Sequence, residues 1–186
     1  MLRISTRSDV RVRPARPRDA LRLAHLRVAS WHHAYRELVE PEALARTTVR
    51  RSYARFREQL GGSPNCSHGI RVLEHLPTGN LWGFVSIGPQ HEPRYPYRGE
   101  IYELYVHPAC QRQGIGRRLL SAGIWALVDR HLNPAMLWVL HDNRHARNFY
   151  ARCGGLMFAA SDARLGGHTL PTVAYGWPST LPCPVD

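Results

Sequence analysis

Hydrophobic and polar positions in the first third of the chain predict one short strand and two helices. Apolar and basic residues alternate over residues 10–13, as in a half-buried strand. From about residue 18 to 38, apolar side chains recur at steps of three and four, the period of an amphipathic helix, and Pro41 is the expected stop. A second such stripe covers residues 49–60 and ends before two glycines.

The middle of the chain predicts a sheet with one parallel connection. Residues 70–74 and 81–87 form an expected antiparallel hairpin, because a turn-rich segment separates them. A third strand is predicted over residues 100–106, followed by a glycine loop and a long helix to about residue 131. The continuous apolar run at 135–140 completes a βαβ unit, since it is typical of a strand buried on both faces.

The last part of the chain predicts one more helix and a final pair of strands. The helix follows Asn143 and closes at two glycines, and the strands cover residues 156–160 and 169–176, before an irregular tail. A length of 186 residues, with 44% hydrophobic and no repeat or linker, fits a single domain. Because no apolar run approaches the roughly 18 residues of a membrane span, and residues 1–9 lack a signal peptide's apolar stretch, we expect a cytoplasmic protein.

Charge and metal-binding residue types exclude several functions. The formal net charge is +11, and all 25 basic residues are arginines. They are scattered from Arg3 to Arg164, whereas nucleic-acid-binding surfaces gather basic residues on one face, so we expect no nucleic-acid partner. The four cysteines stand far apart and are expected to be free thiols, and the histidines lack the spacing of metal ligands.

The most specific chemical feature is the loop of residues 111–116, QRQGIG, between a strand and a helix. Glycines let a ligand approach the backbone closely, and the first N–H groups of a helix have no internal partner. With Arg112, Arg117 and Arg118 beside them, these groups predict a pyrophosphate site, although a plain tight turn is the alternative. The loop lacks a Walker lysine and the third glycine of a dinucleotide fingerprint, which argues against nucleoside triphosphates and NAD.

With strand and loop in place, residues 100–120 resemble motif A of the GNAT superfamily of acyl-CoA-dependent N-acetyltransferases. Its signature, Q/R-x-x-G-x-G/A, matches Gln111, Gly114 and Gly116, after LYVHP at 104–108. The segment NRHARNFYARCGG at 143–155 is similar to the family's N-x-x-A-x-x-F-Y-x-x-x-G-F, with glycine in place of the last phenylalanine. Residues 31–44 are similar to a bacterial branch of the family, so the resemblance spans most of residues 10–177.

The resemblance implies an α/β (α+β) fold, namely a mixed, mostly antiparallel sheet with one splayed parallel strand pair and flanking helices. Acetyl-CoA is then the co-substrate, with pantetheine between residues 100–106 and 135–140 and no metal. Asn143 would bond cofactor or substrate, or cap its helix, and these roles are compatible. The implied cofactor-binding residues are Leu104, Tyr105, Val106, Gln111, Arg112, Gln113, Gly114, Ile115, Gly116, Arg117 and Asn143.

The resemblance also implies the catalytic groups. Tyr150 would protonate the departing thiolate of coenzyme A, with plain helix packing as the alternative reading. The Val106 N–H would polarise the thioester carbonyl. As the base that accepts the amine proton we prefer Glu103 over Glu100, which strand alternation sends to opposite faces; a solvated or salt-bridged carboxylate is the alternative for either.

We therefore expect direct transfer from acetyl-CoA to a primary amine of a small molecule or a peptide, since no nucleophile–base pair is evident. Trp31, His32, Tyr35 and Trp82 are candidates for the acceptor side, with core packing favoured for Trp31. A homodimer is compatible with this function. The alternatives are an inactive acyl-CoA-binding sensor or interaction module, and a basic module associated with RNA or ribosomes.

Overall fold

One sheet with helices on both faces organises the protein. The computed structural model describes residues 9–62, 68–165 and 167–178, so Cys66, Cys183 and the tail lie outside the described residues. The strands are β1 (Val10–Pro14), β2 (Gly69–His75), β3 (Asn80–Pro89), β4 (Gly99–Val106), β5 (Ala135–Leu140), β6 (Leu156–Leu165) and β7 (His168–Trp177). The helices are α1 (Ala20–Tyr35), α2 (Pro41–Ala45), α3 (Val49–Gly61), α4 (Ile115–Val128) and α5 (Arg144–Arg152), with 3₁₀ turns η2 (Pro17–Asp19) and η3 (Pro108–Cys110).

The sheet has the order β1-β2-β3-β4-β5-β7-β6, and every neighbouring pair is antiparallel except β4 and β5. This confirms the predicted fold class. The parallel pair is held together only at Gly99 opposite Ala135 and Glu100 opposite Met136. Beyond these two positions the strands separate toward their C-terminal ends, as the splayed pair of the prediction requires.

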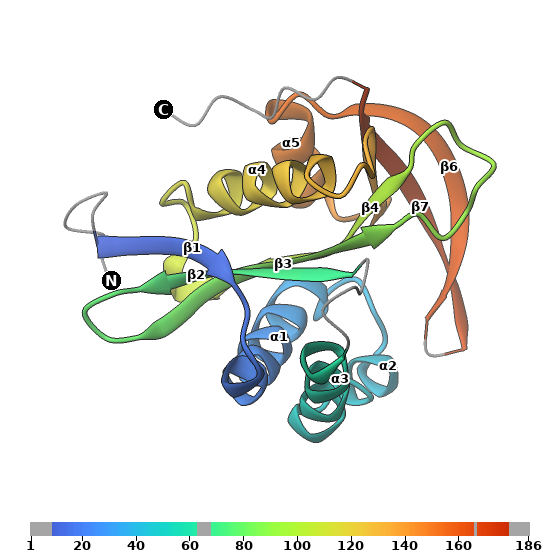
Figure 1. The fold of residues 1–186 in the computed structure, drawn as a ribbon. Helices are drawn as coiled ribbons and strands as arrows, with labels where there is room; N and C mark the ends of the chain where they lie inside the picture. Colours follow the sequence, from blue (N-terminus) through green and yellow to red (C-terminus); the bar gives the residue numbers. More distant parts are fainter. Residues whose placement is uncertain (1–8, 63–67, 166, 179–186) are drawn as a thin grey trace.

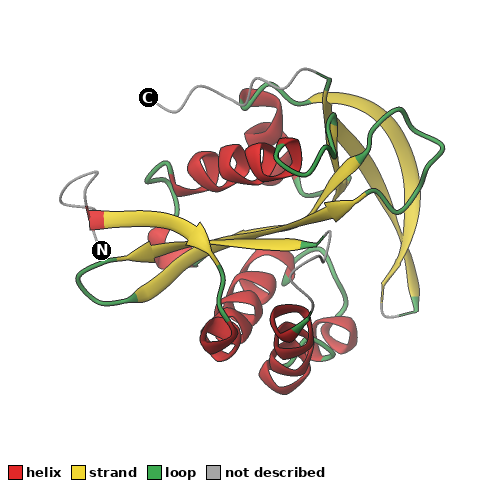
Figure 2. Cartoon of the chain, viewed as in Figure 1, coloured by secondary structure: helices red, strands yellow, loops and turns green. Residues whose placement is uncertain are grey.

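Two apolar layers fix the helices against the sheet (Figures 1 and 2). Helices α4 and α5 cover one face, where Leu119 and Leu120 of α4 are buried with Leu137 of β5. Helices α1 and α3 cover the other face, where Leu23 and Phe56 are buried with Phe84. Because successive strand residues point to opposite faces, the central strands β2, β3 and β4 supply side chains to both layers.

The chain between α1 and α3 differs from its prediction. Helix α1 ends at Tyr35 rather than near residue 38, and Pro41 starts the short helix α2 instead of only stopping α1. Proline is well tolerated in the first turn of a helix, where its missing N–H would have no partner. A helix of five residues is too short to display the periodicity that sequence analysis uses.

A bulge interrupts the pairing of β4 with β3. Glu103 pairs with Ser86, and the next pair along β3 joins Ile87 to Ile101. Tyr102 is therefore an extra residue in β4, which is the definition of a β-bulge. The bulge lies close to the point where β4 separates from β5. It reverses the face of the sheet to which each following side chain points, relative to strict alternation from Glu100.

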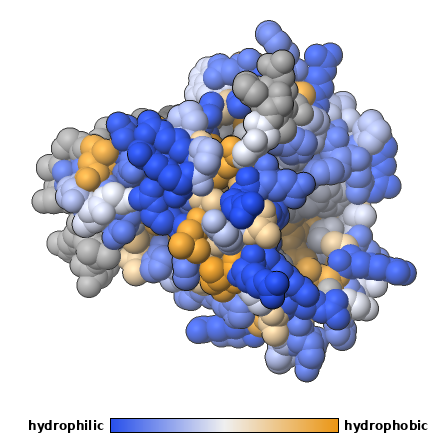
Figure 3. Space-filling view, turned by 60° about the horizontal axis from the view of Figure 1, so that its bottom comes forward, coloured by the Kyte–Doolittle hydropathy of each residue, from blue (hydrophilic) through white to orange (hydrophobic). Residues whose placement is uncertain are grey.

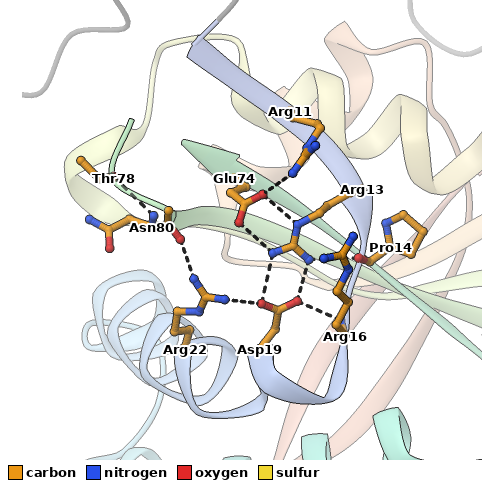
Figure 4. Close-up of polar contacts among 10 residues, drawn as sticks. Arg11, Arg13, Pro14, Arg16, Asp19, Arg22, Glu74, Thr78 and Asn80 are labelled. Carbon is orange, nitrogen blue, oxygen red and sulfur yellow. Dashed lines mark hydrogen bonds and ion pairs between the residues drawn. The ribbon is translucent and has the colours of Figure 1, made fainter. Parts of the chain in front are cut away.

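Buried ion pairs tie β1 to β2 and to the start of α1 (Figure 4). The Arg13 guanidinium, only 6% exposed, donates two hydrogen bonds to Asp19, at 2.6 and 3.1 Å, and two to Glu74, both at 2.9 Å. Asp19 is fully buried and also accepts from the Arg16 amide and the Arg22 guanidinium. Every charge in this Arg13 network thus has a partner of opposite sign.

We expect Asp19→Ala to lower the free energy of unfolding by about 3 to 5 kcal/mol, because it leaves part of a buried guanidinium unpaired. Chemical denaturation measures this change. Glu37→Ala is the control, since it removes an exposed pair with Arg36 and should cost less than about 1 kcal/mol. Equal effects of the two substitutions would show that the Arg13 network does not stabilise the fold.

The Arg13 network also predicts how stability depends on pH. Hydrogen bonds from Arg13 lower the pKa of Glu74 from 4.5 to about 2. Burial raises the pKa of Asp19, but hydrogen bonds from Arg13 and Arg16 outweigh this effect and lower it. A carboxylate with a depressed pKa in the folded state stabilises the fold above its unfolded pKa and loses that contribution as pH falls.

Denaturation at a series of pH values should therefore show stability falling between about pH 5 and pH 2. Glu74→Gln, which cannot ionise, should make the fall shallower. A slope that is the same in the variant and the native protein would contradict the assignment to Glu74.

Candidate functional site

A deep cleft opens where β4 and β5 separate. Its volume is about 1360 Å³, and its walls come from α1, β4, the loop before α4, β5 and α5. Leu104 and Val106 contact the apolar layer under α4 and α5, whereas Glu103 and Tyr105 lie on the α1 and α3 side. The cleft therefore reaches both faces of the sheet through the gap between the two strands.

The predicted cofactor-binding and catalytic residues all line this cleft. They are Glu103, Leu104, Tyr105, Val106, Gln111, Arg112, Gln113, Gly114, Ile115, Gly116, Arg117, Asn143 and Tyr150. Their convergence follows from the βαβ connection, which places the loop after β4 and the start of α5 after β5 at the same edge of the sheet.

The glycine loop presents open backbone to the cleft. Gly114 precedes α4 with a φ of 76°, a left-handed conformation that favours glycine, and Arg112 has a φ of 63°. A Cβ built on Gly114 would meet no atom within 4 Å, so the cleft is open at this point. The first N–H groups of α4 have no carbonyl partner within the helix, which suits them to an anion beside Arg112 and Arg117.

Packing against α5 favours glycine at position 116. A Cβ there would lie 3.2 Å from the Phe149 ring, closer than an ordinary contact. The absence of a side chain thus lets the first turn of α4 approach α5. The loop is shaped by packing as well as by its open backbone.

The edge of β4 that faces the cleft is free to bond a ligand. Within the described part of the chain, no strand pairs with this edge beyond Glu100. The Val106 carbonyl accepts bonds from the Ser30 hydroxyl at 3.3 Å and the Gln111 amide at 3.4 Å, which fixes the end of the strand to α1 and to the loop. An extended ligand with amide groups can add to such an edge as a strand does.

Tyr150 lies in α5 with 8% of its surface exposed. Its ring contacts Phe149, Tyr175 and Trp177, with ring centres 5.3 to 6.2 Å apart. Burial, with smaller effects from Tyr35 and Cys153, raises its pKa well above the ordinary value, so the hydroxyl keeps its proton. This hydroxyl has no hydrogen-bond partner among the residues that the structure describes, and it can donate into the cleft.

Asn143 joins the two sides of the cleft. Its Oδ1 accepts from the Ala146 amide at 3.1 Å, which caps α5 as expected. Its side chain also lies near the Tyr35 hydroxyl, as does that of Tyr105. Burial raises the pKa of Tyr35, and the interactions with Tyr105 and Asn143 offset only part of the rise, so Tyr35 is a neutral phenol.

The expectation that Glu100 and Glu103 point to opposite faces is wrong. Glu103 pairs with Ser86 and Glu100 pairs with Gly88, and these β3 residues are two apart on one face. The bulge at Tyr102 inserts one residue between the two glutamates and so brings them to the same side.

Neither glutamate presents a free carboxylate. Glu103, 9% exposed, accepts from Arg27 at 2.6 Å and from Arg55 at 2.8 and 3.2 Å. Glu100 accepts from the His91 amide and ring at 3.1 and 3.0 Å. Because two guanidiniums already occupy both carboxylate oxygens of Glu103, this geometry favours an anchoring role for Glu103.

One of the four residues expected on the acceptor side lines the cleft. Tyr35 lines the cleft as expected, but Trp31, His32 and Trp82 do not. Trp82 belongs to the buried layer under α4, stacked on His75. The structure adds lining residues that the sequence did not single out, namely His33, Tyr102, Trp138, His145, Asn148 and Arg152.

Neither a metal site nor a membrane span accompanies the cleft within residues 9–62, 68–165 and 167–178. Over these ranges, no group of three or more His, Cys, Asp or Glu side chains is placed to hold a metal. Cys110 and Cys153 are buried free thiols. No helix in the same ranges has both the length and the apolar character to cross a membrane.

Comparison with known proteins relates this chain to one family. The model of the Acetyltransferase (GNAT) family matches residues 27–155. The uncharacterized N-acetyltransferase YuaI of Bacillus subtilis is 29% identical over 169 residues, which cover 91% of this chain and 93% of that protein. A mycothiol acetyltransferase of Arthrobacter is 36% identical over 80 residues, 42% of this chain but only 24% of that protein.

Solved structures show the same fold. The PaiA N-acetyltransferase of Thermoplasma acidophilum, in complex with coenzyme A, aligns with a TM-score of 0.68 and 18% identity, over 90% of this chain and 99% of that chain. At this identity the likeness concerns the arrangement of strands and helices.

Proposed function

This chain belongs to the GNAT family of acetyltransferases, and we propose that it transfers an acetyl group from acetyl-CoA to the nitrogen of a primary amine. The observation that carries the proposal is the cleft between β4 and β5, with the open glycine loop at one end and the buried Tyr150 hydroxyl inside it. An acyl donor with a pyrophosphate and two amides has a matching group for each part of this cleft.

The fit rests on three features of the cleft. The α4 N-terminus with Arg112 and Arg117 would hold the pyrophosphate. The free edge of β4 at residues 104–106 would bond the pantetheine amides. The Val106 N–H is proposed to polarise the thioester carbonyl, where negative charge develops as the amine attacks.

Transfer would proceed directly. The lone pair of the neutral amine forms the new C–N bond, and the C–S bond breaks as the carbonyl re-forms. Tyr150 would donate its proton to the departing sulfur and would then regain a proton from water in the cleft, while the amine nitrogen loses one proton as the amide forms. In place of a base on β4, water reaching the cleft, or His33 at its rim, would carry the amine proton to solvent.

The experiment is a screen of primary amines with acetyl-CoA, in which release of the free thiol is monitored and the acetylated product is identified by mass spectrometry. The proposal predicts amine-dependent thiol release with one acetyl group transferred for each thiol. Acetyl-CoA binding without turnover on any amine would instead support a non-catalytic acyl-CoA sensor.

A further inference from the structure

The half of the cleft on the α1 and α3 side is lined by aromatic rings. Tyr102 and Tyr105 come from β4 on one side of the gap, Trp138 comes from β5 on the other, and Tyr35 comes from α1. Leu137 belongs to the layer under α4 and α5, so alternation directs Trp138 to the opposite face. These four residues form the aromatic wall of the cleft.

Contacts beyond the cleft hold Trp138 in place. Its ring meets Tyr95 edge to face, with centres 5.9 Å apart, and Tyr95 meets Phe158 of β6 in the same way at 5.3 Å. Tyr97 lies 4.6 Å from Phe158. The Tyr95 ring thus packs on the half-buried Trp138 and is itself backed by Phe158, so Trp138 presents a supported ring face to the cleft.

Several polar groups of this half already interact with other groups of the protein. The Tyr102 hydroxyl donates to the Pro89 carbonyl. The Tyr35 hydroxyl lies near the side chains of Tyr105 and Asn143 and interacts with both. What these residues present to an acceptor is therefore ring surface more than free donors and acceptors.

The small number of acidic residues that line the cleft also argues against a polyamine acceptor. Glu103 is the single Asp or Glu among the described residues that line the cleft, and two arginines neutralise it. A polyamine acceptor needs free carboxylates to replace the solvation of its distant ammonium groups. Figure 3, which brings the α1 to α3 side forward, shows hydrophobic surface near the centre of a mostly hydrophilic face, on a scale that does not colour tyrosine and tryptophan as hydrophobic.

We propose that the acceptor is a primary amine carried on a short chain from an aromatic ring, and that Trp138 is the residue that selects it. This inference rests on the proposed acetyl transfer and adds the class of the acceptor. The aromatic wall would hold the ring of the acceptor, while the amino group reaches the gap between β4 and β5 where the thioester is attacked.

The test compares phenethylamine with spermidine and glucosamine as acceptors under saturating acetyl-CoA. We expect kcat/KM for phenethylamine to exceed the values for the other two by about 10-fold or more, since only phenethylamine buries a ring against the wall. Binding of phenethylamine to the protein loaded with coenzyme A, followed by calorimetry, provides a readout besides turnover.

Substitution then assigns the preference to one residue. Trp138→Ala should raise KM for phenethylamine by roughly 10-fold or more with a smaller change in kcat, and Trp138→Phe should restore part of the loss. Trp125→Ala is the matched control, because Trp125 is 48% exposed on α4 and does not line the cleft. Acetyl-CoA affinity should be unchanged in all three variants.

Two results separate this inference from the function it rests on. If spermidine or glucosamine is the better acceptor, or if Trp138→Ala acts no more strongly than Trp125→Ala, the acceptor class is wrong and acetyl transfer stands. A protein that binds acetyl-CoA but neither binds nor acetylates phenethylamine also contradicts the acceptor class. If acetyl-CoA itself does not bind, the result contradicts the proposed acetyl transfer and, with it, the acceptor class that rests on it.

Discussion

Tyr150→Phe should reduce turnover by about 10- to 10⁴-fold while acetyl-CoA binding stays close to that of the native protein. The substitution keeps a ring that packs against Phe149, Tyr175 and Trp177 and removes only the hydroxyl. That hydroxyl lies in the cleft without a protein partner among the described residues, so its loss should cost the reaction more than the fold. Steady-state kinetics with an accepted amine, together with calorimetry of acetyl-CoA binding, measure the two effects.

Tyr175→Phe is the matched control, because Tyr175 is buried beside Tyr150 and does not line the cleft. It loses the same atom and should leave turnover per folded molecule near the native value. If Tyr150→Phe also leaves turnover unchanged, Tyr150 is a packing residue and has no place in the mechanism. Because burial raises its pKa, Tyr150 should add no titration to the rate profile near neutral pH.

Gly114→Glu should weaken acetyl-CoA binding by roughly 100-fold or more, equivalent to about 2.7 kcal/mol. The new carboxylate would extend into the open cleft, where the proposal places the pyrophosphate, and would repel it. Calorimetric titration gives the dissociation constant. Unfolding measurements should show that acetyl-CoA no longer stabilises the variant.

The backbone strain of this substitution needs its own control. Gly154 also has a left-handed φ, 78°, a Cβ there would meet no atom within 4 Å, and the residue does not line the cleft. Gly154→Glu therefore introduces the same charge and comparable strain at the far end of α5. Equal loss of binding in both variants would mean that instability, rather than the phosphate site, explains the effect.

Continuous segments made most of the fold and much of the cleft predictable. The glycine loop and the Asn143 helix are each contiguous, and both follow strands whose ends meet at one edge, so their residues converge without detailed packing. The βαβ connection could be inferred from periodicity alone. The splay of β4 from β5 followed from the family resemblance and not from the pattern of apolar residues.

The rest depended on partners distant in sequence. Arg27 and Arg55 bond Glu103 across 76 and 48 residues, so no local pattern reveals that this carboxylate is paired. The bulge at Tyr102 arises from the register between β3 and β4, which strand alternation does not specify. Trp138 lies in an apolar run that indicates a buried strand. It lines the cleft because β4 separates from β5 before this position, which the apolar run does not predict.

The most direct test of the account is a calorimetric titration of the protein with acetyl-CoA, accompanied by thermal unfolding with and without the ligand. The account predicts binding of one acetyl-CoA per chain and a rise in unfolding temperature, since a ligand at about 100 times its Kd adds about 2.7 kcal/mol of stability. No heat of binding and no shift at saturating acetyl-CoA would contradict the assignment of the cleft between β4 and β5 as its site.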